Sequence, residues 1–579
     1  MLAGFVLAPL VALAACTGSD HEVGRRTPLP TMGIEEPGSR KDPDARGPLA
    51  VPVDAVAGGT VTVVASKAPN TLDPTRAYYT DSTAILNLIT RALTQYVFDR
   101  DTQAMVLSPD MATDLGRHNE DFTRWTFTLK DGLEYEDGSA VTADDVAYAI
   151  ARSFATEELP DGPTYQRTYF LDGQQYQGPF EGGSPYQGVG VDGDDITITM
   201  SRPFPDMDYY ASYPMFTGIP QSRDTKEDYG NHPLATGPYM VEDYRPGKSL
   251  TLVRNPHWDA GSDPGRIQSV DEWQFEFGQD PATTEQAIKR NTGPARTTLT
   301  YDTVSSAGFG WFRDRAQNRL VVGTSPCTYL WYLDMRKITD IRVRKAIGYA
   351  YPYLRAWKAG GEIPGLTRIP GTAILPPGTV GRMDYDVLGN RGQRADPATS
   401  RRLLQEADAT GFEIRFAYAP GDPTSEAVTK VVSAGLEAGG FTVTPFVPSS
   451  KIRAHQTEDD SPANVRSGGW CSDFPTGASW FPEQWDGSLV GRAGMPNPAH
   501  FEKADADEMQ QEILRGENGD PDLAWGEFDE FIERTYFPAV NLGYAGVANV
   551  RGADIGGMAI DNVRGMPTFT TTYVAQQNP

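Results

Sequence analysis

The sequence is poor in the residues that build metal centres and catalytic dyads, because its 579 residues include six histidines and three cysteines. The metal-binding pattern His-Glu-x-x-His is absent, and so is the Gly-x-Ser-x-Gly nucleophile elbow of many hydrolases. Catalytic triads need not be local in sequence, so a hydrolase remains an alternative at this point. We nevertheless expect no catalytic residue, no metal site and no cofactor.

Long apolar runs and positive charge are also scarce. The body contains no internal run of 18 or more apolar residues, so it offers no candidate transmembrane helix. The formal net charge of -26 opposes binding to nucleic acid and to anionic lipid, since both carry negative phosphates. The length exceeds what one hydrophobic core usually supports, and we therefore expect two or three globular domains.

The pattern at the N-terminus indicates a targeting signal. Residues 1–15 form an apolar run of signal-peptide length that ends in Leu-Ala-Ala directly before Cys16, which resembles a lipobox. In bacterial lipoproteins this cysteine is lipidated and becomes the first residue of the mature chain. No Lys or Arg precedes the run, so an upstream start codon or a trimmed chain stays open, as does a buried N-terminal helix. Residues 16–57 lack periodicity and are expected to form a flexible tether.

Two cysteines remain when Cys16 is assigned to the lipid. An even pair outside the cytoplasm favours a disulfide between Cys327 and Cys471. Two separate buried thiols are the alternative.

The body begins near Gly58 with alternating and helical patterns. Residues 60–65 and 125–129 predict strands, and the apolar spacing in 82–96 predicts a helix. Thr142, with an acid three positions later, predicts a capped helix start. Two short strands over 189–191 and 196–200 predict a hairpin.

The C-terminal half shows a second set of patterns. Two predicted strands, 412–418 and 441–447, flank a helical apolar spacing, which indicates a βαβ unit. A helix that starts near Arg342 should stop or kink near Tyr351, because Pro352 cannot continue it.

Residues 467–475 (SGGWCSDFP) combine features of a ligand-binding strand. Paired glycines let another backbone approach closely, Trp470 offers a flat apolar wall, and the carboxylate of Asp473 only accepts hydrogen bonds, which suits a cationic ligand group. The alternative is a buried strand that ends in an Asx turn at Asp473.

Several blocks, in order along the chain, resemble the signature of the family 5 extracellular solute-binding proteins, which serve peptide, nickel and related importers. These blocks are residues 108–112, 125–129, 137–138, 142–146 with Arg152, 236–239, 254–256, 341–347 with Tyr332 before them, and 396–397 followed by 402–404. The resemblance runs from about Gly58 to the C-terminus. It implies an α/β fold of the type II periplasmic-binding-protein kind, with three domains in two lobes around a ligand cleft.

The resemblance also implies a division of the chain. Domain I takes residues 58–90, 226–325 and 541–579, domain II takes 91–225, and domain III takes 326–540. The lobes should hinge around the ligand at crossings near residues 90, 225, 325 and 540.

The strand around Asp473 closely resembles the block of peptide-binding relatives in which the cysteine is disulfide-bonded and the aspartate takes the α-ammonium of the ligand. An extended peptide could pair with the backbone of residues 469–472 as an added strand. The expected ligand contacts are Gly469, Trp470, Cys471, Ser472, Asp473 and Tyr79.

We therefore expect an extracytoplasmic receptor of an ABC importer that is lipid-anchored to the outer face of the membrane. It should be a monomer without enzymatic activity that captures oligopeptides and delivers them to the membrane permease. The alternative is a receptor for an oligosaccharide or another non-peptide solute, since ten Trp and 26 Tyr can supply stacking platforms.

Overall fold

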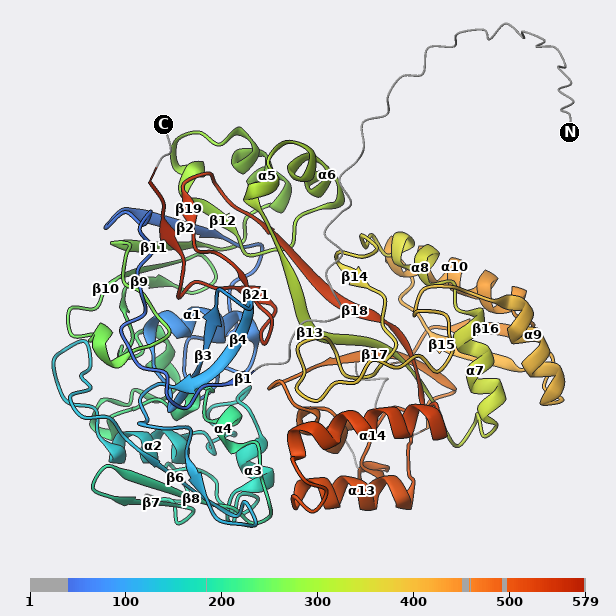
Figure 1. Ribbon diagram of the computed structural model, residues 1–579, viewed down its shortest axis with the longest axis horizontal. Coiled ribbons are helices and arrows are strands. Elements are labelled where there is room, and N and C mark those ends of the chain that lie inside the picture. Colours follow the sequence, from blue (N-terminus) through green and yellow to red (C-terminus); the bar gives the residue numbers. More distant parts are fainter. Residues whose placement is uncertain (1–39, 184, 450–457, 459, 492–496, 577–579) are drawn as a thin grey trace, which may run out of the picture. The chain divides into compact units, whose positions relative to one another are not determined.

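The computed structural model describes residues 40–183, 185–449, 458, 460–491 and 497–576. The expected signal peptide and Cys16 lie outside these residues. We call residues 58–325 together with 541–576 the first lobe, and residues 326–540 the second lobe (Figure 1).

A five-stranded sheet with the order β12-β2-β11-β10-β9 forms one core of the first lobe. Strand β2 (Thr60–Val64) pairs in parallel with β11 (Glu272–Glu276) and β12 (Thr298–Thr300). Strands β10 (Ser249–Arg254) and β9 (Tyr239–Arg245) extend the sheet in antiparallel fashion. The alternating sequence of β2 buries Val61 and Val63 in one apolar core with Ile85 and Leu88 of α1 (Thr80–Ile89).

The helix expected over residues 82–96 is shorter than predicted, because α1 ends at Ile89. From Thr94 the chain forms β3 (Thr94–Asp99), which pairs with β4 (Ala104–Pro109). Sheet pairing here overrides a helical spacing of apolar residues.

A second sheet of the first lobe has the order β5-β6-β8-β7. Strands β7 (Val189–Asp192) and β8 (Asp195–Thr199) form the predicted hairpin, and β8 also pairs with β6 (Arg124–Thr128), which continues to β5 (Arg117–His118). The predicted cap of α2 (Ala143–Arg152) is confirmed. The Thr142 side chain accepts from the Asp145 backbone, and the Asp145 side chain accepts from the Thr142 backbone.

The second lobe contains the predicted βαβ unit. Strands β15 (Glu413–Ala417) and β16 (Thr442–Phe446) pair in parallel, and α10 (Pro423–Ala438) connects them. Helix α7 (Ile341–Ala350) ends before Pro352 as predicted, and α8 (Tyr353–Ala359) follows.

Two long antiparallel strands, β13 (Leu320–Leu333) and β18 (Ala539–Val550), connect the lobes and run side by side in Figure 1. Their sheet has the order β14-β18-β13-β17, in which β14 is Arg368–Ile369 and β17 is Val465–Cys471. Strand β17 is therefore an edge strand of the sheet that the described residues form. The predicted disulfide between Cys327 and Cys471 is present and joins β13 to β17.

The remaining helices and strands complete the two lobes. The helices are α3 (Tyr165–Tyr169), α4 (Met207–Tyr210), α5 (Pro281–Arg290), α6 (Ser306–Arg315), α9 (Pro397–Glu406), α12 (Phe481–Gln484), α13 (Ala504–Leu514) and α14 (Pro521–Thr535). The strands are β1 (Arg40–Lys41), β19 (Ile555–Gly556), β20 (Ile560–Asp561), β21 (Met566–Pro567) and β22 (Tyr573–Val574). Within the described ranges, no helix is long and apolar enough to cross a membrane.

The expectation of a flexible tether over residues 16–57 needs correction over residues 40–57. Strand β1 pairs in parallel with β4, and the Val56 amide donates to the Val574 carbonyl at 2.7 Å. These contacts are made by the backbone at strand edges, so the missing side-chain periodicity of the segment does not reveal them.

Candidate functional site

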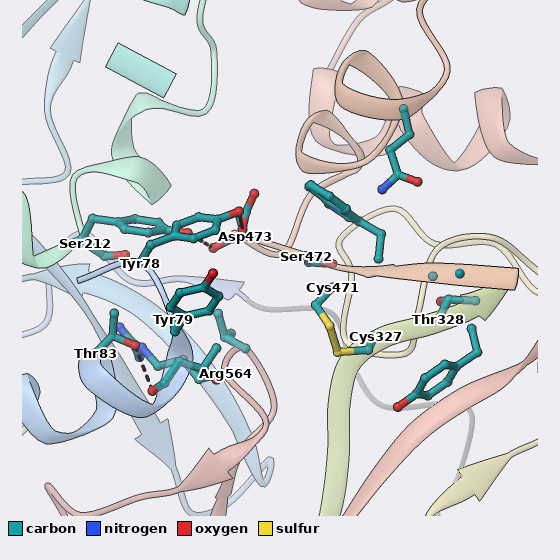
Figure 2. Close-up of a pocket in the computed structure, with 18 of the residues that line it drawn as sticks. Tyr78, Tyr79, Thr83, Ser212, Cys327, Thr328, Cys471, Ser472, Asp473 and Arg564 are labelled. Atoms are coloured by element: carbon teal, nitrogen blue, oxygen red, sulfur yellow. Dashed lines mark hydrogen bonds between the residues drawn. A yellow bond between two sulfur atoms is a disulfide. The ribbon is translucent and has the colours of Figure 1, made fainter. Parts of the chain in front are cut away.

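A cavity of about 810 Å³ lies between the two lobes (Figure 2). The first lobe contributes residues around Tyr78, Tyr213 and Arg564, and the second lobe contributes residues 327–329 and 468–473. The volume falls within the range of about 300–1,000 Å³ that is usual for ligand pockets.

Asp473 lies at the wall of this cavity, two residues after β17 ends, and is held by tyrosines of the first lobe. The Tyr78 hydroxyl donates to Oδ1 at 2.7 Å, and the Tyr165 hydroxyl donates to Oδ2 at 2.6 Å. A third hydroxyl, from Tyr213, donates to the Asp473 carbonyl at 3.0 Å. Burial raises the pKa of Asp473 to about 6, although the hydrogen bonds from Tyr165 and Tyr78 oppose this change.

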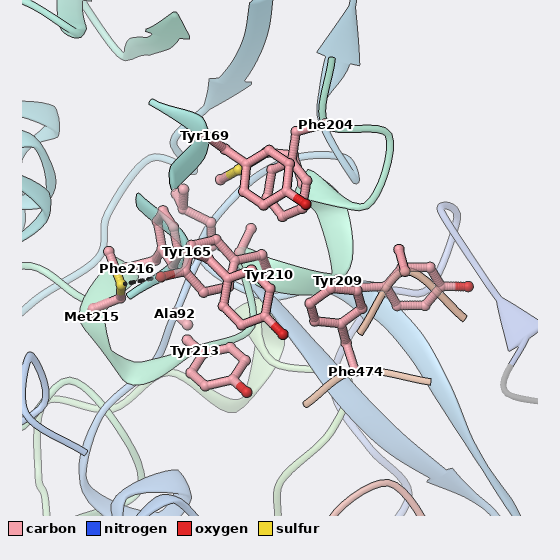
Figure 3. Close-up of a cluster of buried hydrophobic side chains, with 14 of the residues drawn as sticks. Ala92, Tyr165, Tyr169, Phe204, Tyr209, Tyr210, Tyr213, Met215, Phe216 and Phe474 are labelled. Carbon is pink, nitrogen blue, oxygen red and sulfur yellow. Dashed lines mark hydrogen bonds between the residues drawn. The ribbon is translucent and has the colours of Figure 1, made fainter. Parts of the chain in front are cut away.

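The neighbouring Phe474 fixes the position of Asp473. This ring is fully buried among aromatic rings of the first lobe, with centroid distances of 5.4 Å to Tyr165, 6.4 Å to Phe204 and 6.5 Å to Tyr209 (Figure 3). Aromatic packing of this kind buries large areas and has defined geometry. Asp473 therefore belongs to the second lobe by its backbone, while the adjacent Phe474 side chain packs into the first lobe.

The electrostatic surroundings of Asp473 favour a cation. Of the described residues, no Lys, Arg or His forms an ion pair with this carboxylate. Burial and the Asp473 charge raise the pKa of Glu483 to about 7, although the positive charge of Arg202 opposes this change. A positive ligand group would stabilise the ionised forms of these two neighbouring acids.

The cavity also contains one cationic side chain from the first lobe. The Arg564 Nη1 lies 2.9 Å from Asp561 Oδ2, and its guanidinium lies 5.4 Å from the centre of the Tyr96 ring. The charge of Arg564 is thus balanced within its own turn.

A second cavity of about 370 Å³ adjoins the first, and Tyr329 and Gly468 border both. Its walls combine polar and aliphatic side chains with several aromatic rings, among them Trp331, Tyr351, Trp357, Phe416 and Tyr418. The Arg368 guanidinium lies 3.4 Å from the centre of the Tyr329 ring, and its Nη2 lies 2.6 Å from Glu362 Oε1. This stacked pair stands at the boundary between the two cavities.

Within the described ranges, no group of three or more His, Cys, Asp or Glu side chains could hold a metal ion. The chemical groups present at the site are one partly buried carboxylate, tyrosine hydroxyls and an exposed strand edge.

Comparison with known proteins gives the family. The profile of the bacterial extracellular solute-binding proteins, family 5 (middle part), matches residues 106–490. The chain belongs to this family.

Relatives of this solute-binding protein are distant. The probable D,D-dipeptide-binding periplasmic protein DdpA of Escherichia coli (strain K12) is 22% identical over 77% of this chain and 81% of its own length. The periplasmic oligopeptide-binding protein OppA of Salmonella typhimurium is 24% identical over 68% of this chain and 72% of its own. The solved structure of the clavulanic acid biosynthesis oligopeptide binding protein 2 superposes with a TM-score of 0.80, at 24% identity, over 92% of this chain and 99% of that chain. The fold is thus of the periplasmic-binding-protein type, with two lobes around a cleft.

The structure of the solute-binding protein brings the six predicted ligand contacts to one cavity. The side chain of Ser472 is already engaged, since its Oγ accepts from Trp480 Nε1 at 2.5 Å. Trp470 is partly buried and donates from Nε1 to the Ser479 carbonyl at 2.8 Å, whereas Tyr79 is 46% exposed. A Cβ on Gly469 would overlap the Thr328 carbonyl of β13, which explains glycine at this position. Contact of these residues with a ligand stays a prediction.

Sequence reasoning missed the tyrosines that hold Asp473. Tyr78 directly precedes the predicted Tyr79, whereas Tyr165 and Tyr213 come from a middle segment rich in Gly, Tyr and Pro that shows no clear periodicity. The abundance of tyrosine in that segment was the available signal.

Proposed function

We propose that this protein is the extracytoplasmic receptor of an ABC importer and binds peptides between its lobes, with their α-ammonium at Asp473. The observation that carries the proposal is a partly buried carboxylate without an ion-pair partner among the described residues, next to the edge strand β17. A carboxylate has about four acceptor positions, and the two tyrosine hydroxyls occupy two of them. The remaining positions suit an ammonium group.

The edge of β17 supports a peptide over other cationic solutes. An extended peptide can form main-chain hydrogen bonds with an exposed strand edge, which gives affinity that tolerates different side chains. A peptide that starts at Asp473 and follows β17 would pass Gly468 and Tyr329 and reach the second cavity. At about 3.3 Å per residue, this path takes roughly five or six peptide residues.

Native mass spectrometry of protein purified from its own producer tests the proposal. Co-purified peptides should appear as a ladder of masses that disappears after partial unfolding and refolding. A single glycan mass would instead favour the oligosaccharide alternative.

Calorimetry with a series of peptides from two to eight residues should show affinity that rises up to roughly five or six residues and then levels off. The variant Val428→Trp, which narrows the second cavity, should weaken hexapeptides more than dipeptides. Equal affinity across the whole series would contradict the proposed path along β17.

Lipid anchoring at Cys16 is part of the proposal. The variant Cys16→Ser should leave the membrane fraction, because the acyl chains supply the attachment and the acidic protein has no net positive charge to replace them. Cell fractionation with a fatty-acid label provides the measurement. Unchanged label and unchanged membrane retention would show that Cys16 is not the anchor.

A further inference from the structure

We infer that Lys41, the second residue of β1, is a clasp that holds the two lobes closed. Its Nζ lies 2.9 Å from Asp208 Oδ2 of the first lobe and 3.3 Å from Asp522 Oδ2 of the second lobe. One side chain from the segment that leads to the predicted anchor thus bridges both sides of the cleft.

The two ion pairs have different roles when the lobes move. Strand β1 pairs with β4 of the first lobe, so Lys41 should move with that lobe, which also contains Asp208 in α4. Asp522 lies in the first turn of α14, in the second lobe. Opening would therefore keep the pair with Asp208 and break the pair with Asp522.

The clasp is needed because acidic side chains meet at this contact. Asp206 and Asp208 are buried at the start of α4. In addition to the effect of burial, the negative charge of Asp522 raises the pKa of Asp206, and the negative charge of Asp208 raises the pKa of Asp522. Burial and the Asp522 charge raise the pKa of Asp206 to about 8. Thr476 Oγ1 donates to Asp206 Oδ1 at 2.6 Å, whereas no hydrogen-bond partner within the described ranges reaches Oδ2.

Among the described residues, Lys41 is the cation that forms ion pairs with Asp208 and Asp522. Burial lowers the pKa of Lys41, but the charges of Asp208 and Asp522 outweigh this effect and raise it. The ammonium also lies 4.2 Å from the centre of the Tyr209 ring, whose hydroxyl donates to Asp522 Oδ2 at 3.2 Å. Without Lys41, carboxylates of the two lobes would face one another with no opposite charge between them.

The test compares lobe opening in full-length Cys16→Ser protein that carries dyes at Asp228→Cys and Glu437→Cys, two exposed positions on different lobes. Single-molecule energy transfer without added ligand reports the ratio of open to closed molecules. Lys41→Met should raise this ratio roughly tenfold, which is less than the loss of a fully buried charge pair would cause, because the Lys41 side chain is 33% exposed. Arg40→Met, at the exposed neighbouring position of β1, is the matched control and should leave the ratio unchanged.

A second substitution distinguishes the loss of the Lys41 ion pair from a general disturbance of the structure. Adding Asp522→Asn to Lys41→Met removes a carboxylate that has lost its partner, so the open fraction should fall back towards that of the unmodified chain. An unchanged ratio in Lys41→Met, or no recovery in the double variant, would overturn the inference. Neither measurement depends on the identity of the ligand, so the peptide proposal stands or falls separately.

Discussion

Replacing Asp473 by asparagine should weaken the binding of free-amine peptides by about 2–5 kcal/mol, the usual effect of removing one partner of a buried charge pair. Asparagine keeps the shape and one acceptor oxygen, and its amide can still bond to a tyrosine hydroxyl. The loss should therefore reflect the charge rather than a change of structure. Isothermal calorimetry with one defined hexapeptide gives the measurement.

The peptide offers the complementary change. Acetylation of its N-terminus removes the ammonium, so it should cost about as much as Asp473→Asn, and the two changes together should cost little more than either alone. The matched control is Glu483→Gln, which removes the neighbouring acid that does not line the cavity and should have the smaller effect. Equal affinity of free and acetylated peptides for the native protein would show that Asp473 does not bind the ammonium and would favour the alternative that it is a turn residue.

The same ion pair makes binding depend on pH. The pKa of Asp473 in the free protein is raised to about 6, so this carboxyl is largely neutral below that pH and cannot pair with an ammonium. A bound ammonium favours the ionised form, so affinity should be highest near pH 7 and fall by up to about tenfold per pH unit below 6. It should also fall above about pH 8, where the α-amino group of the free peptide loses its proton. Asp473→Asn should remove the fall on the acid side. Glu483, with a pKa of about 7, titrates nearby, and Glu483→Gln distinguishes its contribution.

The parts of the fold that could be predicted from sequence are those in which local pattern and tertiary pairing agree. The βαβ unit over residues 413–446 and the capping box at Thr142 have both a local signal and a confirming structure. Local pattern and tertiary pairing disagree at residues 90–96. The helical spacing of apolar residues continues past Ile89, but from Thr94 on the chain forms β3 and pairs with β4. Local consistency is therefore informative, but it does not decide where an element ends.

The structure gives a physical reason for the presence of Arg152 in one of the family blocks. Arg152 is fully buried, and its Nη1 and Nη2 lie 2.8 Å and 2.9 Å from the two carboxylate oxygens of Asp73, while Nε lies 3.1 Å from Asp224. These partners are 79 and 72 positions away in sequence. A motif can reveal that such a residue matters, but the identity of its partners comes from the fold.

The site shows the same limit. The glycines, Trp470 and Asp473 are contiguous, so their chemistry was visible in the sequence, whereas Tyr78 and Tyr165 reach Asp473 across separations of 395 and 308 residues. Long-range contacts of this kind carry no local pattern.

A buried ionic cluster in the first lobe should make a large contribution to stability. Asp110 of the block 108–112 accepts from Arg91 Nε at 2.7 Å and from Arg266 Nη2 at 2.9 Å, and Arg266 Nη1 donates to Asp263 at 3.0 Å. All four side chains are at most 2% exposed. The variant Arg266→Met should lower the free energy of unfolding by about 3–5 kcal/mol, because it leaves buried carboxylates without their partner.

The matched control is an exposed pair of similar length. Arg245 Nε lies 3.0 Å from Asp243, but these side chains are 69% and 50% exposed. Arg245→Met should change the free energy of unfolding by less than about 1 kcal/mol, since water screens such pairs. Urea titrations of both variants, followed by tryptophan fluorescence, measure the difference. Similar losses in the two variants would show that burial does not control the effect.

The sign of the pH dependence gives a second test of the cluster. Burial raises the pKa of Asp263, but the charges of Arg266 and Arg91 outweigh this effect and hold it well below its ordinary value. A carboxyl with a lower pKa in the folded protein stabilises the fold above its unfolded pKa of about 4, and this contribution is lost as the pH falls towards the folded pKa. Arg266→Met weakens the cause of the low pKa, so the variant should lose less stability below about pH 4 than the native protein does. If both proteins lose stability equally with acid, the ionised Asp263 is not stabilised by Arg266.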